Sequence, residues 1–164
     1  MAENNPDGLN DSLSSYKQNI NPVVKTSLVW QRDLIFTGST PQGYEIEFDA
    51  NAQWGCKPTE SLLLSLAGCM GIDIMTILTK MRLKIASFRI ETKGERNEQP
   101  PQYYKTVEMV MHIAGKNLDP VKVERAIALS RNKYCSVFNS LRPDLVLNIR
   151  FVLEDKDLSG DEKV

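Results

Sequence analysis

Apolar and polar residues alternate along two early stretches of the chain and then follow a helical spacing. Residues 23–36 and 44–49 are rich in β-branched and aromatic side chains, and the segment between them, 37–43, has the Gly, Ser, Thr and Pro content of a turn. This pattern predicts a β-hairpin. Residues 58–81 carry apolar side chains at helical spacing and on nearly every side, so we expect a long, deeply buried helix.

The second half of the chain carries five further elements. They are strands at 83–95 and 103–114 around the polar Pro100-Pro101 turn, a helix capped by Asp119 and ending near Asn132, a short helix at 135–141 and a strand at 144–153. The predicted order is β-β-α-β-β-α-α-β. It indicates an α+β fold with two β-sheet regions around a central helix.

The chain ends differ from its middle in composition. Residues 1–22 and 155–164 are polar or charged and hold too few apolar side chains to offset the entropy of ordering them. We therefore expect a polar N-terminal tail, one folded domain over 23–154 and a charged C-terminal tail. A domain of this size has little material to cover an apolar helix on all sides, which favours a homodimer.

The overall charge excludes some functions. The formal net charge is -1, which gives no basic surface for nucleic acid or an anionic membrane. The N-terminus lacks the apolar run of a signal peptide, and no uninterrupted apolar stretch of membrane-spanning length occurs, so we expect a cytoplasmic protein. No motif for an organic cofactor is present.

Three cysteines, Cys56, Cys69 and Cys135, are an odd number for a disulfide framework and are candidates for reactive or simply buried thiols. Cys69 lies in the middle of the predicted long helix between small residues, one turn before Asp73, whose charge disfavours a thiolate. Cys135 is predicted to begin a helix just after two basic residues, which favours a low pKa. Cys56 lies in a loop, where an incidental role is the simpler interpretation.

Two thiols that meet in space can reduce a peroxide together. One thiolate attacks the O–O bond and becomes a sulfenic acid, which condenses with the other thiol to a disulfide. Inert packing of both cysteines is the alternative.

The only histidine, His112, is predicted on the outer face of a strand. A zinc site needs three or four ligands with at least one close pair, and the sequence spacing shows none, so no metal site is predicted. A cysteine-dependent hydrolase requires His112 or a carboxylate beside Cys69, and it stays open as an alternative.

Two segments carry a family resemblance. Residues 57–73, KPTESLLLSLAGCMGID, resemble the Pro-x-Glu-Leu-Leu-x-x-x-Leu-Gly-Gly-Cys helix of OsmC-like proteins, and 133–137, KYCSV, is similar to their second cysteine motif. The resemblance extends over about 27–153. It points to the OsmC-like branch of the superfamily that also contains the organic hydroperoxide resistance proteins.

The resemblance implies an OsmC-like fold in an intertwined homodimer, with active sites at the subunit interface. Cys69 matches the peroxidatic position, Cys135 the resolving one, and Glu60 the glutamate at the start of the cysteine helix. The family also uses an arginine near the first turn, but 38–43 contains none. Arg32 is the nearest candidate, and an ordinary surface arginine is the alternative interpretation.

The implied function is a thiol-dependent peroxidase that reduces hydrogen peroxide or organic hydroperoxides and is reset by an external dithiol. Neither a metal nor an organic cofactor belongs to this mechanism. The alternative within the same family is a dimer without peroxidase activity, which binds an apolar ligand in its interface cleft.

Overall fold

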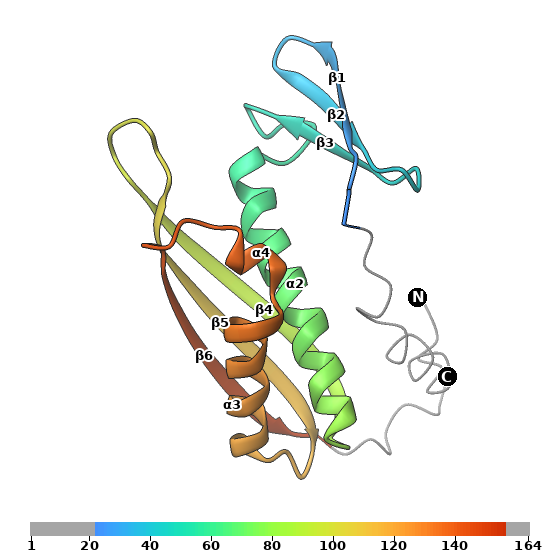
Figure 1. Cartoon of the computed structure of the whole chain (residues 1–164), viewed down its shortest axis with the longest axis vertical. Helices are drawn as coiled ribbons and strands as arrows, with labels where there is room; N and C mark the ends of the chain where they lie inside the picture. The colour runs from blue at the N-terminus through green and yellow to red at the C-terminus, as the bar shows by residue number, and fades with distance from the viewer. Residues whose placement is uncertain (1–21, 157–164) are drawn as a thin grey trace. The chain divides into compact units, whose positions relative to one another are not determined.

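The computed structural model describes residues 22–156, and the chain forms two compact units that divide after Pro58 (Figure 1). Each unit is described by itself below. The mixed α+β class with two small sheets and a long helix is confirmed. The predicted tails, 1–22 and 155–164, lie outside the described residues except for Pro22, Asp155 and Lys156, and Asp155 is the last residue of a strand.

The first unit is a three-stranded antiparallel sheet in the order β1-β2-β3. Its strands are β1 (Ser27–Arg32), β2 (Ile35–Ser39) and β3 (Glu45–Asp49). The prediction of one strand over 23–36 is wrong, because the chain reverses at Asp33, whose φ of 45° lies in the left-handed region that aspartate tolerates. A two-residue turn leaves the run of apolar and β-branched residues nearly uninterrupted, so the pattern alone did not reveal it.

A loop after β3 is organised by the Asp49 side chain, which is 3% exposed. Its carboxylate accepts hydrogen bonds from the backbone N–H groups of Asn51, Gln53 and Trp54 at 2.8, 3.0 and 3.1 Å. These bonds, the one from Asn51 foremost, lower the Asp49 pKa. Cys56 closes the loop through a backbone N–H bond to the Glu47 carbonyl, 3.1 Å long.

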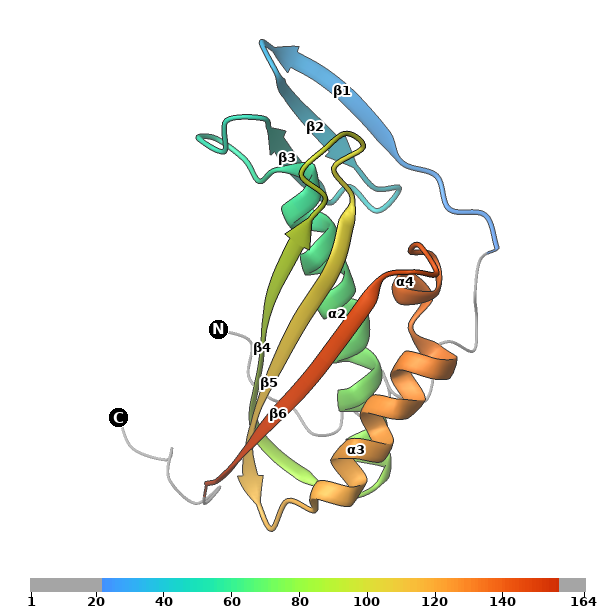
Figure 2. The ribbon, with the colours of Figure 1, turned by 90° about the vertical axis from the view of Figure 1, so that its left-hand side faces the viewer.

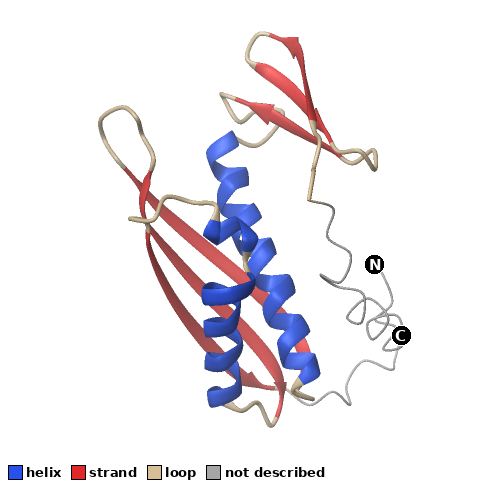
Figure 3. Cartoon of the chain, in the orientation of Figure 1, coloured by secondary structure: helices blue, strands red, loops and turns tan. Residues whose placement is uncertain are grey.

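The second unit is a three-stranded sheet with its helices on one face (Figures 2 and 3). Its elements are α2 (Pro58–Lys80), β4 (Lys84–Arg96), β5 (Tyr104–Lys116), α3 (Pro120–Leu129), the π-helical turn η1 (Ser130–Tyr134), α4 (Ser136–Asn139) and β6 (Val146–Asp155). β4 and β5 form the predicted hairpin. β6 returns beside β5 in parallel after the α3 crossover, so the sheet order is β4-β5-β6.

The core of this unit lies between the sheet and the helices. Every second side chain of β5 is buried there: Val107, Met109, Met111 and Ile113, none more than 1% exposed. The inner face of α2 meets them with Leu66, Met70, Ile74 and Leu78, which are also 1% exposed or less. Complete burial of an aliphatic side chain of this size stabilises a fold by about 1.5–3 kcal/mol, so these two rows anchor α2 on the sheet.

The outer face of α2 is apolar but exposed within one chain. Leu64 and Ile72 are 64% and 55% exposed, and Gly68 between them is exposed too. The expectation of deep burial therefore holds for one face of α2 only. Among the described residues, α2 is also the one helix long and apolar enough to cross a membrane, with a mean hydropathy of 1.9 over 18 residues. Its anchoring in the core identifies it as the central helix of a globular domain.

Candidate thiol site

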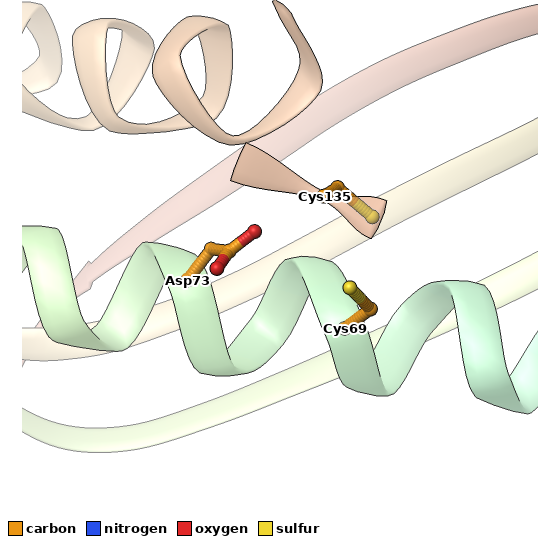
Figure 4. A group of neighbouring side chains, drawn as sticks. All are labelled: Cys69, Asp73 and Cys135. Carbon is orange, nitrogen blue, oxygen red and sulfur yellow. The ribbon is translucent and has the colours of Figure 1, made fainter. Parts of the chain in front are cut away.

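Two residues of α2, Cys69 and Asp73, lie close to Cys135 from a distant part of the chain (Figure 4). The Sγ atoms of Cys69 and Cys135 and a carboxylate oxygen of Asp73 all lie within 4.8 Å of one another. Cys69 and Asp73 are one turn apart on α2 and so share a face of the helix. The predicted meeting of the two thiols therefore agrees with the observed arrangement. The nearness of Asp73 to Cys69 follows from the helical spacing, whereas its nearness to Cys135 is a feature that the sequence analysis did not predict.

The π-helical turn after α3 presents the second cysteine to this cluster. The Cys135 N–H donates to the Ser130 carbonyl at 2.8 Å, a bond that spans five residues. In a regular α-helix two residues five apart point about 140° away from each other, whereas the wider π turn brings them to one side. Ser130 and Cys135 are both 0% exposed as a result.

Asp73 is a buried carboxylate, with 2% of its surface exposed. The Ser130 hydroxyl donates a hydrogen bond to its Oδ2 atom at 3.0 Å. Burial of a carboxylate is costly unless hydrogen bonds compensate it, so this bond both stabilises Asp73 and fixes its orientation. The carboxylate is thereby held next to the two sulfur atoms.

Cys135 caps the short helix α4, as predicted, and accepts a hydrogen bond on Sγ from the Phe138 N–H at 3.3 Å. The prediction of a low pKa is nevertheless wrong. Burial, together with the neighbouring Cys69 and Asp73, raises the pKa of Cys135 to about 12, and the Phe138 bond opposes this rise only in part. The two basic side chains on which the prediction was based, Arg131 and Lys133, contact aromatic rings. Arg131 stacks over the Phe138 ring at 5.7 Å and Lys133 over the Tyr134 ring at 5.4 Å.

Cys69 is the more accessible of the two thiols. It is half-buried, while Cys135 is fully enclosed. Its neighbour Gly68 is exposed, and a side chain added there would meet nothing within 4 Å. Cys69 is therefore the thiol that a small molecule reaches more easily.

The other two predicted site residues are Glu60 and Arg32. Glu60 is exposed in the first turn of α2, nine residues before Cys69, which amounts to about 13 Å along the helix axis. Arg32 ends β1 in the first unit, where its guanidinium lies 5.8 Å from the centre of the Trp54 ring. Their roles beside the Cys69 sulfur stay predictions.

His112 lies on the outer face of β5, as predicted, because its neighbours Met111 and Ile113 point into the core. Its Nε2 atom is 3.4 Å from a carboxylate oxygen of Glu91 on β4. The sheet thus separates His112 from the thiols. A cysteine-dependent hydrolase requires His112 or a carboxylate beside Cys69, and of these two alternatives the structure places the Asp73 carboxylate there.

A groove of about 290 Å³ opens next to the first half of α2. Its lining is mainly apolar and comes from α2, from β5 and the turn before it, and from the segment between α4 and β6: Thr59, Leu62, Leu63, Leu66, Gln102, Tyr103, Tyr104, Val107, Ser140, Leu141, Arg142 and Leu145. At this groove Arg142 stacks on the Tyr103 ring at 3.9 Å and forms a two-bond ion pair with Asp144. Leu66 lies one turn before Cys69, so the groove and the thiol site are neighbours on α2.

Comparison with known proteins identifies the family. The family model for OsmC-like protein matches residues 49–150, and the chain belongs to this family. Protein YhfA of Escherichia coli K12 is 32% identical over 109 residues, which cover 66% of this chain and 81% of YhfA.

Solved structures agree on the fold. A hypothetical protein from Aquifex aeolicus VF5 superposes with a TM-score of 0.76 at 29% identity, covering 84% of this chain and all of that one. The organic hydroperoxide resistance protein OhrB of Bacillus subtilis superposes with a TM-score of 0.56 at 14% identity, covering 79% and 98% of the two chains. At 14% identity, the similarity to OhrB shows a shared fold.

Proposed function

We propose that this protein is a thiol-dependent peroxidase that reduces hydrogen peroxide or organic hydroperoxides through Cys69 and Cys135. The proposal is supported above all by the close approach of these two sulfur atoms, which are 66 residues apart in the chain and lie within 4.8 Å. Membership of the OsmC-like family and the fold shared with an organic hydroperoxide resistance protein give it further support.

The difference in burial supports different roles for the two cysteines. A peroxide must reach the attacking sulfur, and Cys69 is the half-buried thiol. Cys135 is fully enclosed and keeps its proton because its pKa is raised to about 12, which makes it a poor first nucleophile at neutral pH. Cys69 is therefore the peroxidatic residue and Cys135 the resolving one.

The reaction consists of two balanced steps and a reset. The Cys69 thiolate attacks one oxygen of R–O–O–H, the O–O bond breaks, and the alkoxide leaves as R–OH after it takes up a proton, which leaves a sulfenic acid on Cys69. Cys135 then attacks this sulfur, the S–S bond forms, and water leaves. An external dithiol supplies two electrons and two protons to regenerate both thiols, which fits a reducing compartment such as the cytosol.

Asp73 has a place in the second step. The Cys135 thiol must lose its proton as it attacks, and burial makes that loss unfavourable. The Asp73 carboxylate, fixed by Ser130, lies within 4.8 Å of the Cys135 sulfur and is suited to accept the proton. We assign it as the general base of disulfide formation.

A second copy of the chain completes the proposal. Leu64, Gly68 and Ile72 form an exposed apolar stripe on α2, four residues apart, and Gly68 leaves room for the close approach of another helix. We propose that α2 of a partner subunit packs on this stripe. In such a dimer Glu60 and Arg32 keep the roles that the family implies for them, orienting and stabilising the Cys69 thiolate.

A second candidate function is favoured by the apolar groove of about 290 Å³. A cavity of this volume with few polar groups suits a small apolar ligand. In this alternative the dimer binds such a ligand without reducing peroxide. Ligand binding that persists in Cys69→Ser, with no peroxide consumed by the wild type, favours it over the peroxidase.

Peroxide consumption coupled to a dithiol tests the first proposal. Wild type and Cys56→Ser are expected to turn over cumene hydroperoxide at similar rates. Cys69→Ser is expected to be inactive. When the dithiol is left out, Cys135→Ser should consume about one equivalent of peroxide and stop at the sulfenic acid, which dimedone labels. Equal turnover by Cys69→Ser and wild type would refute the assignment.

A further inference from the structure

The three groups of the thiol site are all acids held close together in a mostly buried position. Each of Cys69, Asp73 and Cys135 offers one donor atom, and the three donor atoms lie within 4.8 Å of one another. Asp73 and Cys135 have 2% and 0% of their surfaces exposed. A cation bound among the three groups would take all three donor atoms as ligands.

We propose that the reduced site binds one divalent metal ion of the Zn²⁺ type per chain, through the two sulfur atoms and the Asp73 carboxylate. Thiolate and carboxylate are both zinc ligands, and three protein ligands with one open position is a common zinc arrangement. Tetrahedral bonds of about 2.3 Å place two sulfur ligands about 3.8 Å apart. The donor atoms lie within 4.8 Å, so adjustments of about 1 Å bring them to that geometry.

The surroundings of the donor atoms match those of a metal site. The Phe138 N–H already donates to the Cys135 sulfur, and the Ser130 hydroxyl donates to one Asp73 oxygen. Hydrogen bonds of this kind orient metal ligands and stabilise their anionic forms. Cys69 is half-buried, so the open fourth position lies on the side from which water enters.

Metal binding and disulfide formation exclude each other. On binding, each thiol gives its proton to solvent and the thiolate becomes a ligand, so two protons are released for each metal ion. A disulfide offers no thiolate. The metal site does not depend on the peroxidase function, since it requires only the reduced side chains.

Cobalt and zinc titrations of the reduced full-length protein test this proposal. Co²⁺ is expected to bind at one equivalent with thiolate-to-cobalt charge-transfer absorption, and Zn²⁺ should displace it. Cys56→Ser is the matched control and should bind as wild type does. Zn²⁺ binding should weaken by about 100-fold or more in each of the variants Cys69→Ser, Cys135→Ser and Asp73→Asn. Loss of a group that only hydrogen-bonds to a metal ligand weakens binding by up to about 100-fold, and loss of a ligand itself should cost at least as much.

Several outcomes overturn the metal proposal. They are an absence of charge-transfer absorption in reduced wild type, retention of it in Cys69→Ser, and equal Zn²⁺ affinity of Asp73→Asn and wild type. Peroxide turnover is measured separately, with a chelator present that keeps metal ions off the thiols. A protein that turns over peroxide but fails to bind Co²⁺ in the titration refutes the metal site alone. A protein that binds Co²⁺ but does not turn over peroxide refutes the peroxidase alone.

Discussion

Burial of the Cys135 thiol predicts that the reduced protein loses stability in alkali. The pKa of Cys135 is raised from its ordinary value of 9.0 to about 12 in the fold. At pH values between these two pKa values the Cys135 thiol is ionised in the unfolded chain and protonated in the folded chain. Unfolding therefore releases a proton, and a rise in pH favours unfolding. The free energy of unfolding should fall by about 1 kcal/mol from pH 8 to pH 10 and by about 4 kcal/mol in full above pH 12.

Urea unfolding of the reduced protein at pH 8 and pH 10 measures this contribution. Other groups titrate in the same range, so the informative quantity is the difference between variants. Cys135→Ala removes the thiol, so the free energy of unfolding of this variant should fall by about 1 kcal/mol less than that of wild type over this interval. Cys56→Ala, whose thiol lies in the loop after β3, should behave as wild type does. Equal pH dependence of Cys135→Ala and wild type would show that the Cys135 pKa is not raised.

Three further predictions follow from the site and the surfaces around it. Asp73→Asn should slow disulfide formation after peroxide treatment by about 100-fold, the lower end of the range for loss of a general base, while sulfenic acid still forms on Cys69. Stopped-flow tryptophan fluorescence with dimedone trapping follows both steps, and an unchanged rate of disulfide formation contradicts the base assignment. Ile72→Glu should yield a monomer in sedimentation velocity. The control Val121→Glu changes a residue of α3 that is 71% exposed and should leave the dimer intact. A dimeric Ile72→Glu variant contradicts the proposed interface. His112→Ala should change peroxide turnover by less than about twofold, because the sheet separates its ring from the thiols, and a large loss would contradict that placement.

Much of the second unit could be predicted because its elements carry strong local patterns. The alternation of apolar residues along β5 and the helical spacing along α2 specify both type and face. Asp119 and Pro120 predicted the start of α3 because an aspartate can cap the free N–H groups of the first helical turn. The Asp119 carboxylate accepts this hydrogen bond from the Val121 N–H at 2.9 Å. Such signals are local, so the sequence alone carries them.

The features that were missed depend on tertiary contacts. The turn at Asp33 lies inside a run of apolar and β-branched residues, where only the pairing of β1 with β2 reveals it. The environment of Cys135 was predicted from its neighbours in sequence, but its pKa is decided by burial against α2. The role of Asp73 was missed because it requires the π turn that brings Ser130 and Cys135 to the same side.

The nearness of the Cys69 and Cys135 sulfur atoms is the central claim, and peptide mapping of the oxidised protein tests it most directly. The Cys56→Ser variant, treated with one equivalent of hydrogen peroxide and digested without reduction, should yield one linked peptide pair that joins Cys69 to Cys135, with loss of both free thiols. Two free thiols, or a Cys69 oxidised to sulfinic acid beside an intact Cys135 thiol, would contradict the account.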